Sequence, residues 1–212
     1  MCGRYYIDED AENEMLTECI RQAQARAERM GVAMLTRGEI APTSIVPVIA
    51  TSASHREQGA FPMRWGFTHP SHNVLVFNTR SETAAEKPLF CTSIDDRRCA
   101  IPASRYFEWK KESNGKKTKY AFAQETGEPL FLAGLYLRGS QSSLPCFTIL
   151  TRDASDGVKE IHGRMPVILP AASLDAWLSP ENPYDAIIRD AVTALRVKYA
   201  AFTEIVERRN SD

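Results

Sequence analysis

The sequence predicts one α+β domain in which a mixed, barrel-like β-sheet is flanked by peripheral helices. Nine short segments have the apolar patterns of β-strands, and helical patterns occur near the two ends of the chain. Strands and helices do not alternate along the sequence, so a parallel βαβ architecture is not expected. The chain has 212 residues, enough to bury a sizeable core, and no repeat or linker-like segment divides it. The single domain is therefore expected to span residues 1–212.

The first element is an amphipathic helix, expected from about Asp8 to Met30. Asp8 or Asp10 can accept hydrogen bonds from the first helical N–H groups, and Gly31 is suited to follow the end of the helix. The apolar residues that recur at helical spacing are Leu16, Ile20, Ala23, Ala27 and Met30. This single stripe predicts that the helix lies on another part of the domain.

From residue 45 onward the chain is expected to form mainly short strands. The predicted strands are Ile45–Ala50, Phe61–Phe67, Val74–Phe77, Arg98–Ile101, Arg105–Lys111, Lys117–Ala123, Pro129–Leu137, Phe147–Thr151 and Pro166–Leu169. Two later segments, Ser173–Leu178 and Tyr184–Leu195, have helical patterns.

Asn114 and Gly115 form a strong turn signal, so the strands on either side of them are expected to form a β-hairpin. This hairpin carries five lysines against a single glutamate, Glu112. The lysines either protect a solvated sheet edge or contact phosphate groups.

The composition excludes several classes of protein. Hydrophobic residues make up 43% and charged residues 25% of the chain, as in ordinary soluble globular proteins. The 26 Lys and Arg residues are balanced by 27 Asp and Glu residues, which excludes a basic protein that coats nucleic acid but not a local basic groove. No apolar run approaches the ~20 residues that cross a bilayer, and the first residues lack the apolar stretch of a signal peptide. We therefore expect no membrane association and a cytoplasmic location.

The cysteines and histidines do not suggest a metal site. The five cysteines are odd in number and lack CxxC spacing, so they are expected to be reduced thiols and not disulfides or zinc ligands. His69 and His72 form an HxxH pair without a nearby third ligand. The sequence therefore predicts no metal ion.

The N-terminus carries chemistry that an internal cysteine lacks. Cys2 follows Met1, and methionine aminopeptidases generally remove Met before so small a residue, which would give Cys2 a free α-amine. Such an amine has a pKa of about 7.7–8.0, so an appreciable fraction is unprotonated at neutral pH. A 1,2-aminothiol condenses with an aldehyde to a Schiff base, and its sulfur then closes a thiazolidine ring. Alternatively the amine acts as the base for the thiol, as in N-terminal nucleophile hydrolases, or Cys2 is an incidental buried thiol.

Three further segments combine residue types that transfer protons or bind anions. Asn78 and Arg80, at the end of a predicted strand, offer an orienting amide and an anion donor, or else belong to a helix cap. Glu108 lies between large aromatic residues, where desolvation would raise its pKa into the range of a general acid, unless its side chain faces outward. His162 lies in a loop before an apolar strand and is either an acid–base group or a structural histidine.

Taken in order, these segments resemble the SRAP family, the SOS response-associated peptidases, also described as abasic-site processing proteins. The resemblance extends from Met1 to about Leu178, in the segments MCGR, IAPTSIVPVI, MRWGF, NTRSETA, RRCAIPASRYFEWK, FLAGLY, FTILTRDA and IHGRMPVIL. It implies a compact SRAP-like α+β fold with a positively charged groove. It also implies a DNA-damage protein that senses abasic sites in single-stranded DNA and links to them covalently through its N-terminal cysteine, near the nucleoid.

The resemblance assigns roles to individual residues. The implied catalytic residues are the nucleophile Cys2, its orienting partner Asn78, and the proton-transfer groups Glu108 and His162. The implied DNA contacts are Arg4, Arg80 and Arg164, together with Trp65 and Trp109 as base-stacking side chains. This chemistry requires no metal and no organic cofactor. The protein is expected to act as a monomer on single-stranded DNA that contains abasic sites, with a crosslinking, lyase-like activity.

Two other functions use the same residues. Cys2 would be the nucleophile of a peptidase hydrolase that removes Met1, or the chain would be a noncatalytic single-strand DNA-binding module. The first lacks an evident oxyanion hole, and the second leaves the coincidence of Cys2 with the Glu108 and His162 segments unexplained. The segment after Trp65 is short and the chain from Glu181 onward lacks the family's late Asn-containing block, so the DNA lid and the end of the groove are expected to differ.

Overall fold

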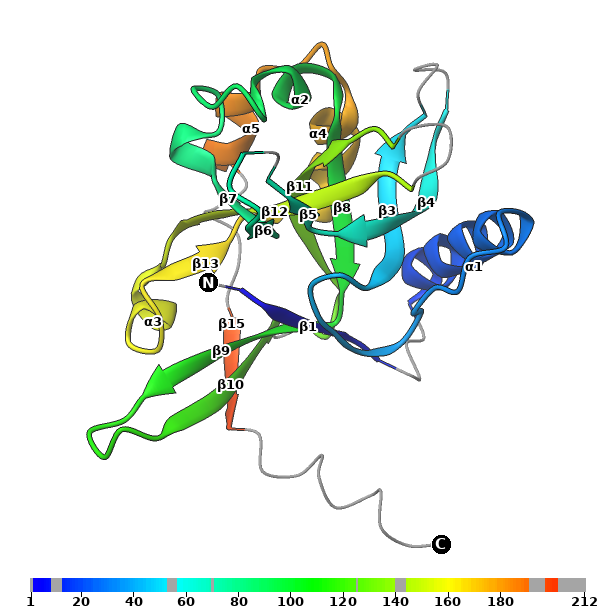
Figure 1. Ribbon diagram of the computed structural model, residues 1–212. Helices are drawn as coiled ribbons and strands as arrows, with labels where there is room; N and C mark the ends of the chain where they lie inside the picture. The colour runs from blue at the N-terminus through cyan, green and yellow to red at the C-terminus, as the bar shows by residue number, and fades with distance from the viewer. Residues whose placement is uncertain are drawn as a thin grey trace, which may run out of the picture.

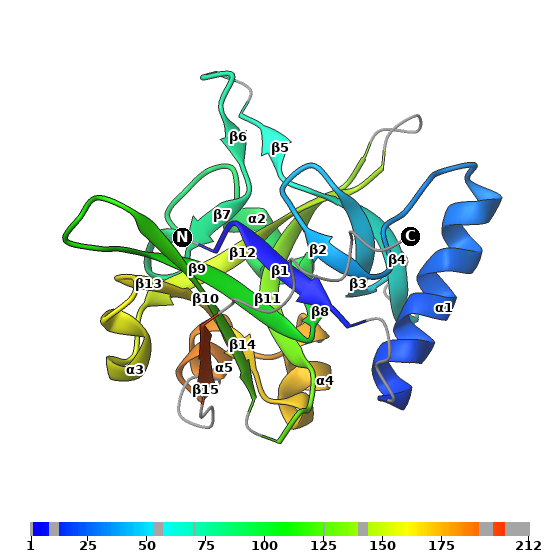
Figure 2. The same cartoon turned by 90° about the horizontal axis from the view of Figure 1, so that it is seen from below.

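Two β-sheets form the centre of the molecule, and helices lie around them (Figures 1 and 2). The computed structural model describes residues 2–8, 13–52, 57–69, 71–124, 126–139, 144–190 and 197–201. This arrangement confirms the α+β class expected from the sequence.

The larger sheet has eight strands and curls back on itself. Its strands are β3 (Ile45–Thr51), β4 (Gln58–Trp65), β7 (Asn78–Arg80), β8 (Arg98–Ala103), β11 (Leu130–Leu137), β12 (Cys146–Asp153), β13 (Arg164–Pro166) and β14 (Ile168–Leu169). The pairing runs from β12 through β4, β3, β8 and β11 and returns to β12. Strand β12 is parallel to β4 and β7, whereas the other pairs are antiparallel. The sheet is therefore mixed, as predicted.

The smaller sheet carries the start of the described chain. Its order is β15 (Val197–Ala201), β10 (Lys117–Gln124), β9 (Arg105–Lys111), β1 (Arg4–Ile7) and β2 (Gly38–Ile40), and every pair is antiparallel. Strands β9 and β10 form a hairpin that projects from the body of the molecule (Figure 1). Gly115 has a φ of 79°, which a residue with a side chain rarely adopts. The Asn114–Gly115 hairpin is thereby confirmed. Two short strands, β5 (Phe67–Thr68) and β6 (Leu75–Val76), form a separate ribbon.

Helix α1 (Glu14–Arg29) begins later than predicted. Asn13, not Asp8, accepts the capping hydrogen bond, from the backbone N–H of Leu16 at 3.1 Å. Asp8 is held at the end of β1, because its backbone N–H donates to Ser104 and its carboxylate pairs with Arg105. The alternative cap, Asp10, lies outside the described residues. The buried stripe of the helix is Leu16, Cys19, Ala23 and Ala27, so the prediction that Met30 belongs to it was wrong.

The remaining helices are short. They are α2 (Cys91–Asp96), α3 (Asp156–Lys159), α4 (Leu174–Leu178) and α5 (Tyr184–Asp190), with 3₁₀ turns at Ser81–Thr83 and Ala171–Ser173. Helices α4 and α5 were both predicted, although the predicted end of the second, residues 191–195, lies outside the described part of the chain. No helix within that part is long and apolar enough to cross a membrane. All five cysteines are free thiols, as expected.

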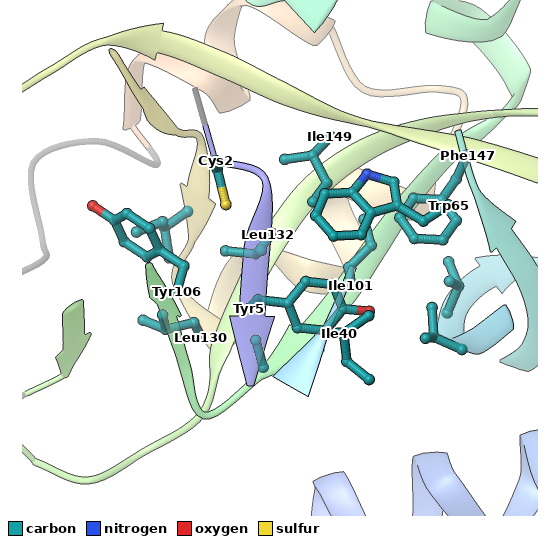
Figure 3. Close-up of a cluster of buried hydrophobic side chains, with 14 of the residues drawn as sticks. Cys2, Tyr5, Ile40, Trp65, Ile101, Tyr106, Leu130, Leu132, Phe147 and Ile149 are labelled. Atoms are coloured by element: carbon teal, nitrogen blue, oxygen red, sulfur yellow. The ribbon is translucent and has the colours of Figure 1, made fainter. Parts of the chain in front are cut away.

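Aromatic side chains fill the core where the two sheets meet (Figure 3). Trp65 stacks on Phe147, with ring centroids 6.3 Å apart, and also contacts Tyr5. Its indole N–H donates to the backbone oxygen of Phe77 at 2.9 Å, and the side chain has no exposed surface. A side chain buried in this way cannot stack on a DNA base, so the structure contradicts the predicted DNA contact of Trp65.

Candidate active site

Strand β1 places Cys2 beside the strand that carries Glu108. Arg4 lies opposite Phe107, and Tyr5 lies opposite Tyr106, so the residues before β1 extend toward Glu108. Tyr106, Phe107 and Glu108 are three consecutive buried residues of β9. The alternative that Glu108 faces solvent is therefore wrong. Cys2 itself is buried, and its side chain points into the core near Tyr106 and Leu132 (Figure 3).

The Cys2 thiol is protonated at neutral pH. Burial raises the pKa of this thiol well above its usual range, and the nearby negative charge of Glu108 raises it further. The sulfur lies 3.7 Å from the backbone oxygen of Arg4, which it can reach as a weak donor. Any reaction of the sulfur as a nucleophile therefore needs a base to remove its proton.

Asn78 ties Cys2 to the larger sheet. It comes from β7, whose parallel pairing with β12 places Asn78 opposite Ile149. Its amide Nδ2 donates to the backbone oxygen of Cys2 at 2.8 Å. Its Oδ1 is buried and accepts no hydrogen bond from the described residues. That oxygen is thus an acceptor close to the backbone of Cys2.

The side chains of Glu108 and His162 lie close to each other. The distance from Glu108 Oε1 to His162 Nδ1 is 3.9 Å. Burial raises the pKa of the Glu108 carboxyl, although the neighbouring His162 acts in the opposite direction. The carboxyl therefore keeps its proton to a higher pH than an ordinary glutamate. This confirms the direction predicted from its aromatic neighbours.

The loop around His162 offers a hydrogen-bond partner to either tautomer of the ring. Its Nδ1 lies 3.0 Å from the backbone nitrogen of Arg164 and 3.0 Å from the backbone oxygen of the same residue. An unprotonated Nδ1 accepts from the Arg164 N–H, and a protonated Nδ1 donates to the carbonyl. The backbone of Arg164 therefore holds the ring in position whichever tautomer is present.

The comparisons with known proteins place this chain in a family. The family model described as "SOS response associated peptidase (SRAP)" matches residues 1–208. The chain belongs to the SRAP family. The resemblance read from the sequence motifs is thereby confirmed.

This SRAP protein is similar to several named sequences, and its fold is similar to that of solved structures. It is 31% identical to the abasic site processing protein YoaM of Bacillus subtilis over 166 residues, which cover 69% of this chain and 72% of YoaM. It is 29% identical to the abasic site processing protein YedK of Escherichia coli over 190 residues, covering 85% and 81% of the two chains. A crystal structure of a Bacteroides thetaiotaomicron protein superimposes with a TM-score of 0.73 at 21% identity, covering 93% of this chain and 90% of that one. The last comparison supports the fold.

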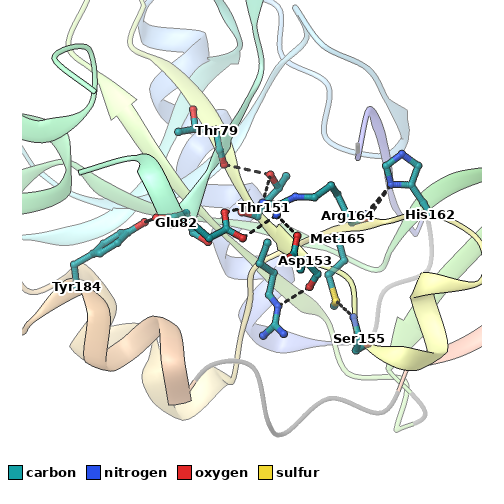
Figure 4. Close-up of polar contacts among 11 residues, drawn as sticks. Thr79, Glu82, Thr151, Asp153, Ser155, His162, Arg164, Met165 and Tyr184 are labelled. Carbon is teal, nitrogen blue, oxygen red and sulfur yellow. Dashed lines mark hydrogen bonds and ion pairs between the residues drawn. The ribbon is translucent and has the colours of Figure 1, made fainter. Parts of the chain in front are cut away.

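Arg164 connects two of the SRAP motifs (Figure 4). Its guanidinium makes two parallel contacts of 2.8 Å with the carboxylate of Glu82, from the NTRSET segment, and one of 2.6 Å with Asp153. It also donates to the backbone oxygen of Thr151 at 2.8 Å. Only 13% of this side chain is exposed. A contact between Arg164 and DNA, as predicted, would have to replace one of these carboxylates.

Glu82 was missed by the sequence analysis, and its contribution can be tested. Pairing with Arg164 lowers the pKa of Glu82, so its stabilisation is present above the pKa of the unfolded chain and is lost as the pH falls through the folded pKa. Glu82 is 45% exposed, so solvent screening limits the effect. We expect Glu82→Gln to lower the free energy of unfolding by about 0.5–1 kcal/mol at pH 7.

Denaturant unfolding at pH 7 and near pH 3 measures this effect. The difference between wild type and Glu82→Gln should shrink at the lower pH, because the carboxylate takes up a proton more readily in the unfolded chain than in the folded one. Glu86→Gln, four residues further along the chain and without an ion pair among the described residues, is the matched control. Equal stability of the two variants at pH 7 would show that the Glu82–Arg164 pair does not stabilise the fold.

The other predicted DNA contacts lie on the surface. Arg80 is exposed at the end of β7, and Arg4 is partly exposed on the outer face of the smaller sheet. Trp109 lies on that same outer face and is half-buried, with the Lys119 ammonium 5.6 Å from its ring centroid. These three remain compatible with a role at the surface, in contrast to Trp65.

A cavity adjoins the site on the side of Asn78. It has a volume of about 580 Å³, and Val76, Asn78, Thr79, Lys87, Leu89 and Phe90 are among its lining residues. Lys87 contributes a positive charge to the wall of this cavity. His69 and Ser71 also line it, and the rings of His69 and His72 stack with centroids 4.6 Å apart. Among the residues that the structure describes, no three His, Cys, Asp or Glu side chains gather as a metal-binding group.

Proposed function

We propose that this SRAP protein processes abasic sites in single-stranded DNA by forming a covalent thiazolidine through Cys2, once Met1 has been removed. The observation that carries the proposal is the buried carboxyl of Glu108, placed beside the cysteine that follows Met1. The names of the relatives, abasic site processing proteins, support the same substrate.

The first half of the reaction uses Glu108 as an acid. The ring-opened abasic sugar presents an aldehyde, and the Cys2 amine adds to its carbon to form a carbinolamine. The carboxyl of Glu108 gives its proton to the departing hydroxyl, which leaves as water. The products are an iminium ion and the Glu108 carboxylate. A carboxyl whose pKa is raised by burial is suited to this step because it holds its proton to a higher pH than an ordinary glutamate.

The second half uses the same group as a base. The Cys2 thiol is protonated, so it must lose its proton as its sulfur attacks the iminium carbon. The Glu108 carboxylate formed in the first half accepts that proton, the C–S bond closes the ring, and the carboxyl is regenerated. The net reaction joins the aldehyde to the aminothiol and releases one water, without a cofactor.

His162 and Asn78 support this sequence. We assign His162 the exchange of protons with Glu108 and the opening of the sugar ring; the 3.9 Å between its Nδ1 and Glu108 Oε1 would have to shorten in the DNA complex. Asn78 holds the Cys2 carbonyl through its Nδ2, and its buried Oδ1 offers an acceptor for the freed amine. The adjoining cavity, with Lys87 in its wall, provides room for the nucleotide next to the lesion.

The environment of Cys2 favours this chemistry over peptide hydrolysis. A peptidase nucleophile works as a thiolate, which requires a lowered pKa. Burial and the Glu108 charge raise the pKa of the Cys2 thiol instead. In the thiazolidine reaction the amine attacks first and the thiol is needed only afterwards, beside a newly formed carboxylate.

The test is a denaturing gel of the mature protein mixed with an oligonucleotide that contains one abasic site. We expect a shifted band that survives denaturation, and an intact mass equal to protein plus DNA minus one water. A tetrahydrofuran analogue of the abasic site lacks the aldehyde, so it should bind without giving this band. No stable band from the abasic strand would overturn the proposed function.

Arg80 is expected to bind a phosphate of the strand. Replacing it by alanine should weaken binding to the tetrahydrofuran oligonucleotide and flatten the slope of log affinity against log salt by about 0.7, the contribution of one neutralised phosphate in a single strand. Fluorescence anisotropy at several salt concentrations measures both quantities. Arg21→Ala, which removes an exposed arginine from α1, is the control. Equal slopes for the two variants would exclude a phosphate contact by Arg80.

A further inference from the structure

The outer face of the smaller sheet carries cations above aromatic rings. Lys119 lies opposite Trp109 in the pairing of β10 with β9, and Arg4 lies opposite Phe107 in the pairing of β1 with β9. The Lys119 ammonium is 4.0 Å from the centroid of the buried Phe107 ring. Figure 2 shows β1 lying between β9 and β2, so these cations come from strands that are close together.

One carboxylate joins the two cations. Glu39, on the edge strand β2, places its Oε1 3.4 Å from Arg4 Nε and its Oε2 2.5 Å from Lys119 Nζ. Each oxygen of the Glu39 carboxylate therefore pairs with a cation from a different strand. The side chains of Glu39 and Arg4 are 42% and 40% exposed, and that of Lys119 is 25% exposed. The cluster is open to solvent on the outer face.

We propose that Arg4 and Lys119 form a binding site for one backbone phosphate of a single-stranded nucleic acid, and that the Glu39 carboxylate occupies this site in the free protein. The inference rests on the proposed function, which supplies the strand. A phosphodiester, like a carboxylate, presents two anionic oxygens on one centre. Two cations bridged by a carboxylate are thus spaced to bridge a phosphate as well.

The surroundings favour such an exchange. Contacts with the Phe107 and Trp109 rings hold the Lys119 ammonium in place, so little additional ordering is needed when a phosphate arrives. Exposed ion pairs contribute little, so the Glu39 side chain can turn into solvent at a small cost. Arg4 is two residues from Cys2 along the chain, so a strand bound at this site lies next to the N-terminal end of β1.

The replacement of the Glu39 carboxylate by a phosphate determines the noncovalent affinity of the protein for any single strand. A phosphate must displace Glu39 before it reaches both cations, so noncovalent affinity is kept low. Undamaged strands then leave quickly, whereas a strand with an aldehyde is retained by the covalent bond. Glu39 is in this sense a specificity-determining residue.

The test measures noncovalent binding to a single strand carrying the tetrahydrofuran analogue. Glu39→Gln should bind about twofold to fivefold more tightly than wild type, with a steeper salt dependence. Lys119→Ala should bind more weakly, and adding Glu39→Gln to Lys119→Ala should restore much less than it gains in wild type. A gain in affinity cannot arise from misfolding.

Two matched variants control for charge. Glu18→Gln removes a carboxylate that is paired with Arg21 on α1, and Glu112→Gln removes one from the β9–β10 hairpin. An affinity gain in Glu39→Gln no larger than in these controls would overturn the inference and leave the proposed function intact. Failure of wild type to crosslink to the abasic strand, while Glu39→Gln still binds the analogue more tightly, would overturn the proposed chemistry alone. If wild type binds no single strand at all, both fail.

Discussion

A form of the protein that retains Met1, or carries one added residue before Cys2, should form no covalent adduct with abasic DNA. In that form the Cys2 nitrogen is an amide, which cannot condense with an aldehyde. Asn78, Glu108 and the surface cations are unchanged, so binding to the tetrahydrofuran strand should persist. Intact mass, a denaturing gel and anisotropy on the same samples separate loss of chemistry from loss of binding.

Cys2→Ser with Met1 removed should give a different result. Its amine still forms an imine, which borohydride reduces to a stable amine, but its hydroxyl is a poorer nucleophile and should not close a durable ring. The expected outcome is a band only after reduction. A stable abasic-DNA adduct in the form with a permanently blocked N-terminus would rule out the thiazolidine mechanism. Removal of Met1 by the purified protein itself would instead favour the peptidase hypothesis.

Glu108→Gln should slow crosslinking by about 10²–10⁴-fold, the range typical of a positioned acid–base group. Glutamine keeps the shape of the side chain but has no proton to give to the carbinolamine and cannot accept one from the thiol. Single-turnover rates at saturating DNA isolate this chemical step from binding. His162→Ala should cause a smaller loss. Unchanged rates in both variants would remove these two residues from the mechanism.

The dependence of the crosslinking rate on pH tests the role of Glu108. The rate should rise with pH as the Cys2 amine loses its proton, at about pH 7.7–8.0 for an ordinary α-amine. It should fall as the Glu108 carboxyl ionises, which burial moves to a higher pH than for an ordinary glutamate. The descending limb should disappear in Glu108→Gln. A descending limb of the same size in the variant would assign it to another group.

Glu108→Gln should lower the crosslinking rate without lowering the stability of the fold. A raised carboxyl pKa means that ionisation is disfavoured in the folded chain, which costs stability as the pH rises above the ordinary glutamate pKa. Glu108→Gln removes that cost, so it should be at least as stable as wild type at pH 7. Denaturant unfolding checks this, and it excludes misfolding as the cause of slow crosslinking.

Sequence patterns predicted the long strands well and the short ones poorly. Strand β9 was predicted with its observed bounds, and β3 within one residue, because six or more residues give a readable apolar pattern. Strands β1, β2 and β7 contain three or four residues each and were not predicted. Their position depends on pairing with residues far along the chain, which a local pattern does not record.

The candidate active site was likewise predicted only where local sequence motifs carry the information. The motifs led to Cys2, Asn78, Glu108 and His162, and the fold brings these four together. Trp65 was misjudged because a tryptophan that packs on another ring in the core has the same sequence signature as one that is exposed. Glu82 pairs with Arg164, 82 residues away, and Glu39 pairs with Lys119, 80 residues away. A single sequence gives no signal for ion pairs between residues so far apart in the chain.

The position of β1 determines how a crosslinked molecule would respond to force. This strand begins two residues after Cys2 and is hydrogen-bonded to β9 on one side and β2 on the other. DNA attached at Cys2 is therefore tethered to an interior strand of a sheet and not to a loose tail. A motor enzyme pulling on the DNA would load both rows of hydrogen bonds together. Unfolding under such a load would require both rows of hydrogen bonds to break.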